Sequence, residues 1–196
     1  MIAPLNRLLN RRPIVVALAG PNGAGKTSFY RTYLKPSGLQ FVNADILAAA
    51  LGADAYRAAK LAEEMRRELI AQRESFIFET VLSDPVGEKL AFLKDAELLG
   101  YTVVLFFIGI DSPETSDGRV ALRVSRGGHD VPHEKIVERF PRVMKNLKRA
   151  LAELANVRVY DNSNLRRPYR LVAVCEEGGN IQIHEPVPNW LRPLLP

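Results

Sequence analysis

The chain of 196 residues has one cysteine and no long apolar run. A single cysteine, Cys175, excludes an intramolecular disulfide and a cysteine-rich zinc site. No apolar stretch approaches the roughly 20 residues that span a bilayer, and residues 1–13 lack the sustained apolar segment of a secretory signal. We therefore expect a protein of the reducing cytoplasm that has no membrane segment.

The composition is otherwise that of a globular protein. Hydrophobic residues make up 47% of the chain and charged residues 25%, which is enough for a substantial hydrophobic core. No internal repeat or low-complexity segment divides the sequence. We predict a single domain over residues 1–196, with a core over about 13–175 and a C-terminal hairpin and extended tail over 169–196.

Positive charge is concentrated in one stretch. The net charge is +5, yet residues 119–149 alone hold nine basic and three acidic side chains. Such a local field suits a polyphosphate or a nucleic acid. The alternative is a solvated basic helix face, which we expect for Arg142, Lys145, Lys148 and Arg149.

Residues 14–27 contain the most informative motif. Six apolar residues, typical of a strand that is buried on both faces, run directly into Gly-x-x-x-x-Gly-Lys-Thr. This pattern predicts a P-loop, in which Lys26 reaches the β- and γ-phosphates and the Thr27 hydroxyl binds Mg²⁺. The alternative is a glycine turn that binds nothing. The predicted nucleotide-binding residues are Gly20, Pro21, Asn22, Gly23, Ala24, Gly25, Lys26, Thr27 and Ser28.

Strands and helices alternate along the rest of the chain. We predict strands over 14–19, 39–42, 75–78, 101–110 and 157–160, followed by a β-hairpin over 169–175 and 180–184. Between them we predict helices over 27–34, 46–51, 53–73, 84–99, 112–126 and 132–155, with Asp84 as one N-cap and a break or kink caused by Pro141. The order predicts an α/β P-loop NTPase fold, with a parallel sheet of about five strands flanked by helices.

Polar residues follow the predicted strands, where ligands bind in parallel sheets. Asp45 could act as the base that takes a proton from an attacking hydroxyl, or it could cap a helix, as Asn43 also could. Glu79 or Asp111 could lie near Mg²⁺ or a sugar hydroxyl; the alternative for Glu79 is a helix cap or a strand-end ion pair. Asn162 also follows a strand, so these groups are expected to converge with Lys26 on one site.

Arg119, Arg123 and Arg126 are spaced to share one helix face, and Arg139 follows a glycine-rich connection. Two arginine-bearing helices joined by glycines predict a lid over the triphosphate. His129 is expected to support the connecting loop rather than to bind zinc, because no third ligand of suitable type lies near it.

These motifs together resemble those of the zeta toxin family of P-loop kinases. The resemblance covers about residues 13–175 and includes the P-loop, Asn43-Ala44-Asp45, Phe78-Glu79-Thr80 and Tyr160-Asp161-Asn162-Ser163. Its most specific part is the Arg-Val-x-x-Arg-Val-x-x-Gly-Gly-His block that starts at Arg119. The better-known members are longer, and in this chain the helix before the arginine block contains Asp117-Gly118, a pair that makes a continuous helix harder to form.

The resemblance implies transfer of a phosphate from ATP or GTP, with Mg²⁺, to a hydroxyl of a UDP-activated sugar such as UDP-N-acetylglucosamine. It implies Asp45 as the base, Lys26 and Thr27 on the triphosphate, and Asn162 near the adenine. Lid arginines for the γ-phosphate match Arg123, Arg126 or Arg139. A small antitoxin protein is the implied partner. The predicted substrate-binding residues are Asn43, Asp45, Glu79, Thr80, Arg119 and His129.

Two other functions remain open at this point. The chain could be a P-loop kinase of another small hydroxylated metabolite, because the P-loop does not determine the acceptor. It could also be a non-catalytic module that binds a nucleotide or, less expected, a nucleic acid through its basic stretch.

Overall fold

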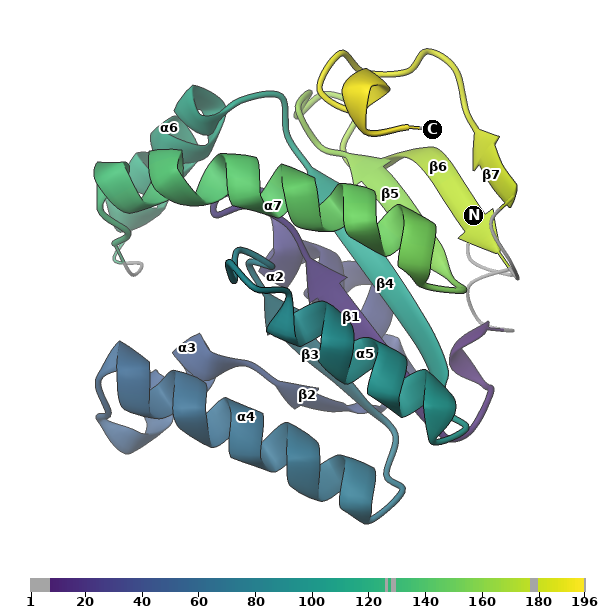
Figure 1. The fold of residues 1–196 in the computed structure, drawn as a ribbon. Coiled ribbons are helices and arrows are strands. Elements are labelled where there is room, and N and C mark those ends of the chain that lie inside the picture. The colour runs from purple at the N-terminus through teal and green to yellow at the C-terminus, as the bar shows by residue number, and fades with distance from the viewer. Residues whose placement is uncertain (1–7, 126, 128–129, 177–179, 196) are drawn as a thin grey trace.

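The computed structural model describes residues 8–125, 127, 130–176 and 180–195, and its centre is a seven-stranded sheet (Figure 1). The strand order is β2-β3-β1-β4-β5-β6-β7. The first five strands pair in parallel, and β6 and β7 continue the sheet as an antiparallel hairpin. The predicted fold class is thereby confirmed. The strands are β1 (Ile14–Ala19), β2 (Gln40–Val42), β3 (Phe76–Thr80), β4 (Thr102–Gly109), β5 (Val157–Asp161), β6 (Arg170–Glu176) and β7 (Asn180–Ile183).

Helices connect the parallel strands. The P-loop leads into α2 (Lys26–Phe29), which continues as a π-helical turn, Tyr30–Leu34, and a 3₁₀ turn, Lys35–Ser37. The remaining helices are α3 (Ala44–Leu51), α4 (Ala55–Ala71), α5 (Glu88–Leu98), α6 (Pro113–Val124) and α7 (His133–Glu153), and a 3₁₀ turn, Arg192–Leu194, lies in the C-terminal tail. Within the part of the chain that the structure describes, no helix is long and apolar enough to cross a membrane.

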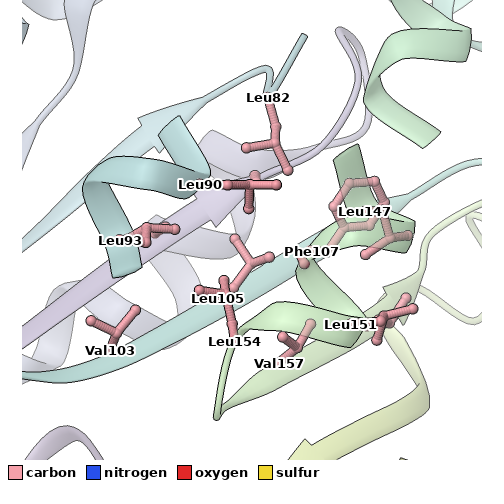
Figure 2. Packing of buried hydrophobic residues seen from close by; sticks show 14 of the residues in the cluster. Leu82, Leu90, Leu93, Val103, Leu105, Phe107, Leu147, Leu151, Leu154 and Val157 are labelled. Carbon is pink, nitrogen blue, oxygen red and sulfur yellow. The ribbon is translucent and has the colours of Figure 1, made fainter. Parts of the chain in front are cut away.

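Two hydrophobic cores cover the two faces of the sheet. Because side chains alternate along a strand, Val15, Ala17 and Ala19 of β1 enter one core, and Ile14 and Val16 enter the other. The first core is closed by α4, α5 and α7, which lie on one face of the sheet in Figure 1. Figure 2 shows how leucines of α5 and α7 pack over β4 and β5 in this core. The second core is closed by α2 and the turn after it.

Strand β1 is the topological switch point of the sheet: the chain first adds β2 and β3 on one side of it and then adds β4 and β5 on the other. It pairs with β3 on one side and with β4 on the other, so the chain crosses to opposite halves of the sheet from a central strand. In open α/β sheets the crevice outside such a switch point is where ligands bind. The P-loop follows β1 at this position.

One local prediction is wrong, and a second is wrong in part. Asp84 does not cap α5, which begins at Glu88 after Gly87, because the backbone before it is tied to α7: the buried Asn146 donates to the carbonyls of Leu82 and Asp84. Pro141 does not break α7, which is continuous from His133 to Glu153; the alternative, a kink at Pro141, stays a prediction. The carbonyl that Pro141 leaves without a helical donor belongs to Val137, and both residues are exposed, so water can satisfy it.

Candidate active site

The P-loop is packed so closely that only glycine fits at its turns. Gly20 has φ +141°, and a Cβ there would overlap the carbonyl oxygen of Ile108 on β4. Gly25 has φ +93°, and a Cβ there would lie 2.8 Å from Nδ2 of Asn162. Both positive φ values are strained for other residues, so the glycine spacing of the motif is required by the backbone path and by its neighbours.

Side chains from distant parts of the chain hold the P-loop in this conformation. Ser116 of α6 donates to the Asn22 carbonyl at 2.6 Å. Asn162 after β5 donates to the Ala24 carbonyl at 2.8 Å, and the Tyr169 hydroxyl donates to the Gly25 carbonyl at 3.0 Å. The loop is thus preorganised before any ligand binds.

Lys26 is held inside the loop. Its Nζ donates to the carbonyls of Gly20 and Pro21 at 2.9 and 3.0 Å, lies 3.9 Å from Glu79, and the side chain is 7% exposed. Burial lowers the pKa of Lys26, and the negative charges of Glu79 and Asp45 oppose that shift. Lys26 is the first residue of α2, and its ammonium group therefore lies among oxygen acceptors close to the end of β1.

Glu79 links the ends of three neighbouring strands. It follows the buried part of β3 and accepts hydrogen bonds from Thr27 Oγ1 and Asn43 Nδ2, each at 3.0 Å from Oε2. Thr27 follows β1 through the P-loop, and Asn43 follows β2. The strand-end ion pair considered for Glu79 exists in the structure, with Lys26, and is one part of this larger network.

Asn43, not Asp45, is the N-cap of α3. Its Oδ1 accepts hydrogen bonds from the backbone N–H groups of Asp45 and Ile46 at 2.8 and 3.1 Å. The capping requirement of this helix is met by Asn43. The Asp45 carboxylate is exposed in the first turn and faces a cavity.

A cavity of about 540 Å³ lies at the C-terminal ends of β1 and β3. Its walls come from the P-loop, the starts of α3 and α5, the length of α4 and the end of α6. Of the predicted site residues, the cavity brings together Asn22, Gly23, Lys26, Asn43, Asp45, Glu79, Thr80 and Arg123.

The other predicted residues lie elsewhere or cannot be placed. Arg119 does not line the cavity; it donates to the Ser163 carbonyl at 2.9 Å, and its buried Nη1 has no hydrogen-bond partner among the described residues. Arg139 on α7 and the exposed Asp111 do not line the cavity. Arg126 and His129 lie outside the described residues.

Sequence reasoning missed the contribution of α4. Arg66 lines the cavity from the buried side of this helix, and Lys60 and Arg67 line it from neighbouring positions. A signal was present, because Arg66 stands four residues after Ala62 and three before Leu69, in the middle of the apolar stripe. A cation at a core position of an amphipathic helix is unusual.

The site contains oxygen ligands that suit Mg²⁺. The Thr27 hydroxyl and the Glu79 carboxylate lie 3.0 Å apart at the mouth of the P-loop. Mg²⁺ is commonly bound through one or two protein oxygens together with phosphate oxygens and water. These two residues therefore fit a magnesium ion that accompanies a nucleotide.

Solved structures share this fold. A chain of the AvrRxo1-ORF1:-ORF2 structure with ATP superposes with a TM-score of 0.70 at 22% identity, over 92% of this chain and 64% of that one. The PezAT toxin-antitoxin system of Streptococcus pneumoniae gives 0.57 at 22% identity, over 85% and 76%. Shikimate kinase from Acinetobacter baumannii, in complex with shikimate, gives 0.51 at 16% identity, over 81% and 88%. At these identities the similarity shows the fold alone, and this chain spans 64% of the length of the AvrRxo1 chain.

Fold and site together define a P-loop protein with a kinase-like α/β architecture. The sequence model of the zeta toxin family matches residues 50–170. The chain therefore belongs to the zeta toxin family, as the motifs predict. A search of curated proteins found no match.

Proposed function

We propose that the protein is a kinase that transfers the γ-phosphate of ATP or GTP to a hydroxyl group of a small molecule. One observation carries this proposal: the P-loop lysine, Lys26, and the exposed carboxylate of Asp45 line the same cavity. A phosphate donor held by the P-loop and an acceptor held in the cavity would meet between these two groups.

The reaction follows from the roles of the residues around the cavity. Asp45 accepts the proton of the acceptor hydroxyl as its oxygen attacks the γ-phosphorus. The new O–P bond forms while the bond from the γ-phosphorus to the β,γ-bridging oxygen breaks, and the nucleoside diphosphate leaves. Lys26 and Arg123 stabilise the negative charge on the phosphoryl oxygens. Asn43 and Glu79 hold the start of α3, and with it Asp45, at the end of the sheet.

Thr27 and Glu79 would hold Mg²⁺, which neutralises charge on the phosphate oxygens when it is bound. In the structure, the Thr27 hydroxyl donates to Glu79. Rotation of this hydroxyl would free an oxygen lone pair for the metal and leave the carboxylate as a neighbouring ligand.

The nucleotide side would use Asn162 and Arg119. Asn162 lies against Ala24 and Gly25 of the P-loop, and we place the nucleotide base near it. The partly unsatisfied guanidinium of Arg119 beside Gly23 suits a phosphate or a ribose oxygen on this side. Arg123, Arg126 and Arg139 remain candidates for the lid, and His129 for the support of its loop.

We propose a UDP-activated sugar such as UDP-N-acetylglucosamine as the acceptor, on the strength of the family. Membership of the family also supports a small antitoxin protein as partner, a single kinase domain over residues 1–196 and action in the cytoplasm. The PezAT structure is that of a toxin-antitoxin system, which agrees with the proposed partner.

The test is incubation of the protein with ATP, Mg²⁺ and a panel of UDP-sugars, followed by mass spectrometry. We expect one sugar nucleotide to gain the mass of one phosphate, and the Asp45→Asn variant to give no such product. If no UDP-sugar in the panel is phosphorylated, the proposed acceptor is wrong. If the protein also binds neither ATP nor GTP, the kinase proposal itself is wrong.

A further inference from the structure

Arg66 is a buried cation that forms no hydrogen bond or ion pair with the described residues. Its side chain is 6% exposed, and its guanidinium carbon lies 5.0 Å from the ring centre of Phe78 and 5.7 Å from that of Phe92. Among the residues that the structure describes, none forms a hydrogen bond or an ion pair with this guanidinium, and its Nε is fully buried. Five N–H donors are therefore left to other partners.

This arrangement is costly unless a ligand completes it. Burial of a charge without a partner is strongly unfavourable, and contact with aromatic rings offsets only part of that cost. Burial lowers the pKa of Arg66, although a guanidinium remains charged at neutral pH. The negative charge of Glu63 on α4 opposes this shift, but the Glu63 carboxylate accepts its hydrogen bond from Arg67, at 2.6 Å.

The same guanidinium borders the cavity that contains Asp45 and Glu79. The described residues that line this cavity include six basic and four acidic side chains, so the cavity as a whole favours an anion. The basic residues on its wall are Lys26, Lys60, Arg66, Arg67, Lys89 and Arg123. Lys26 and Arg123 belong to the phosphate-donor side, whereas Arg66 lies on α4, behind the end of β3.

We propose that Arg66 is a specificity-determining residue that pairs with an anionic group of the acceptor, a phosphate or a carboxylate. The inference rests on the proposed kinase function and deepens it, because it requires an acceptor that carries a negative charge as well as a hydroxyl. A planar guanidinium with several donors binds either anion through two parallel hydrogen bonds. The acceptor anion would accept hydrogen bonds from the Arg66 guanidinium and orient the hydroxyl towards Asp45.

The variant Arg66→Met removes the charge and keeps an unbranched chain over Phe78 and Phe92. The matched control is Arg57→Met, at an exposed position of the same helix that does not line the cavity. Since Arg66→Met removes an unpaired buried cation, we expect the melting temperature of the ligand-free protein to stay the same or rise. A clear fall in the melting temperature, absent from the control, would show that Arg66 serves packing and would overturn the proposal.

Binding is measured by titration calorimetry in two stages. A non-hydrolysable ATP analogue with Mg²⁺ first fills the P-loop, and inorganic phosphate or acetate is then added to the saturated protein. We expect one further anion to bind to the unmodified protein and to Arg57→Met, and its affinity to fall about tenfold to a hundredfold in Arg66→Met, the range for a charge-assisted hydrogen bond. Stronger binding of phosphate or of acetate identifies the type of acceptor anion. Equal affinities in all three proteins, or no second anion in any, would overturn the proposal.

The two stages separate this proposal from the proposed function. If neither the ATP analogue nor the corresponding GTP analogue binds, the kinase function fails at the first stage. The anion titration is then repeated without nucleotide in Lys26→Ala, which lacks the P-loop cation, with and without Arg66→Met. A loss of anion affinity that depends on Arg66 would still support an anion site on α4.

Discussion

The nucleotide side and the acceptor side of the site differ in how far contacts within the protein hold their residues in place. On the nucleotide side, Ser116, Asn162 and Tyr169 each hold a carbonyl of the P-loop, at 2.6, 2.8 and 3.0 Å. On the acceptor side, the Asp45 carboxylate is exposed, and the buried guanidinium of Arg66 has no hydrogen-bond partner among the described residues.

This difference indicates that the nucleotide side recognises a triphosphate in general, whereas the acceptor side selects a particular acceptor molecule. A loop that presents backbone N–H groups to phosphates must be rigid, because a triphosphate is recognised through many simultaneous hydrogen bonds. An acceptor molecule forms hydrogen bonds with polar groups that have no partner within the protein. The unsatisfied polar groups on the acceptor side therefore determine which acceptor is bound. The comparison predicts that changes on the nucleotide side alter donor binding and that changes on the acceptor side alter transfer.

The largest effect is expected from Lys26→Ala. This change removes the cation that stabilises the phosphoryl oxygens, so we expect weaker nucleotide binding and a fall in transfer rate of about 10³-fold or more. Calorimetry with ATP and a steady-state phosphorylation assay measure the two effects. Unchanged nucleotide affinity would contradict the assignment of Lys26 to the donor side.

Asp45→Asn should affect the acceptor side and leave the nucleotide side unchanged. We expect transfer to fall about 10²- to 10⁴-fold, the range for loss of a general base, while ATP binds with unchanged affinity. The helix should be unaffected, because Asn43 provides its cap. If the variant retains a tenth or more of the transfer rate, Asp45 is not the base.

Asn146→Ala tests the segment that follows β3. Asn146 is 3% exposed and donates to the carbonyls of Leu82 and Asp84, so the change leaves one buried and one partly buried acceptor without their donor. We expect a loss of about 2 kcal/mol in the free energy of unfolding, measured with urea, and no change in ATP affinity. The exposed neighbour Lys145→Ala is the control, and an equal loss in both variants would contradict the role of these hydrogen bonds.

Asn162→Ala loosens the nucleotide side. The change removes the hydrogen bond to the Ala24 carbonyl and the acceptor of the Tyr169 N–H. We expect ATP affinity to fall by about 1 kcal/mol with a much smaller change in the rate at saturating ATP. Asn164→Ala, at an exposed position two residues further on, should bind ATP normally. A decrease in rate without a decrease in affinity would place Asn162 on the acceptor side instead.

The smallest effect concerns pH. The pKa of Lys26 is lowered from its ordinary value of 10.5 by burial, so the unfolded chain binds more protons than the folded one between the lowered pKa and 10.5. Stability therefore rises with pH across that window. Relative to Lys26→Met, the unmodified protein should gain free energy of unfolding as the pH rises towards 10.5. Urea unfolding at several alkaline pH values measures this, and a constant difference would contradict the burial of a charged lysine.

Much of the fold follows from local patterns that tertiary contacts do not override. The alternation of apolar strands with amphipathic helices predicts the parallel sheet, and the residues flanking 176–179 predict the hairpin of β6 and β7. The exceptions depend on contacts or on exposure to solvent that the local sequence pattern does not specify. The start of α5 depends on Asn146, 62 residues from Asp84, and the continuity of α7 depends on the exposed position of Pro141.

The sequence by itself determined the P-loop, the parallel sheet around it and the family, because these depend on residues that are adjacent or regularly spaced along the chain. Only the tertiary structure decided that Asn43 caps α3 and leaves Asp45 exposed, and that Arg119 and Arg123, one helical turn apart, lie at different parts of the site. The same holds for Arg66, whose side chain reaches the cavity because α4 packs against β3 and α5. Such roles depend on which segments meet in space, and no local pattern specifies that.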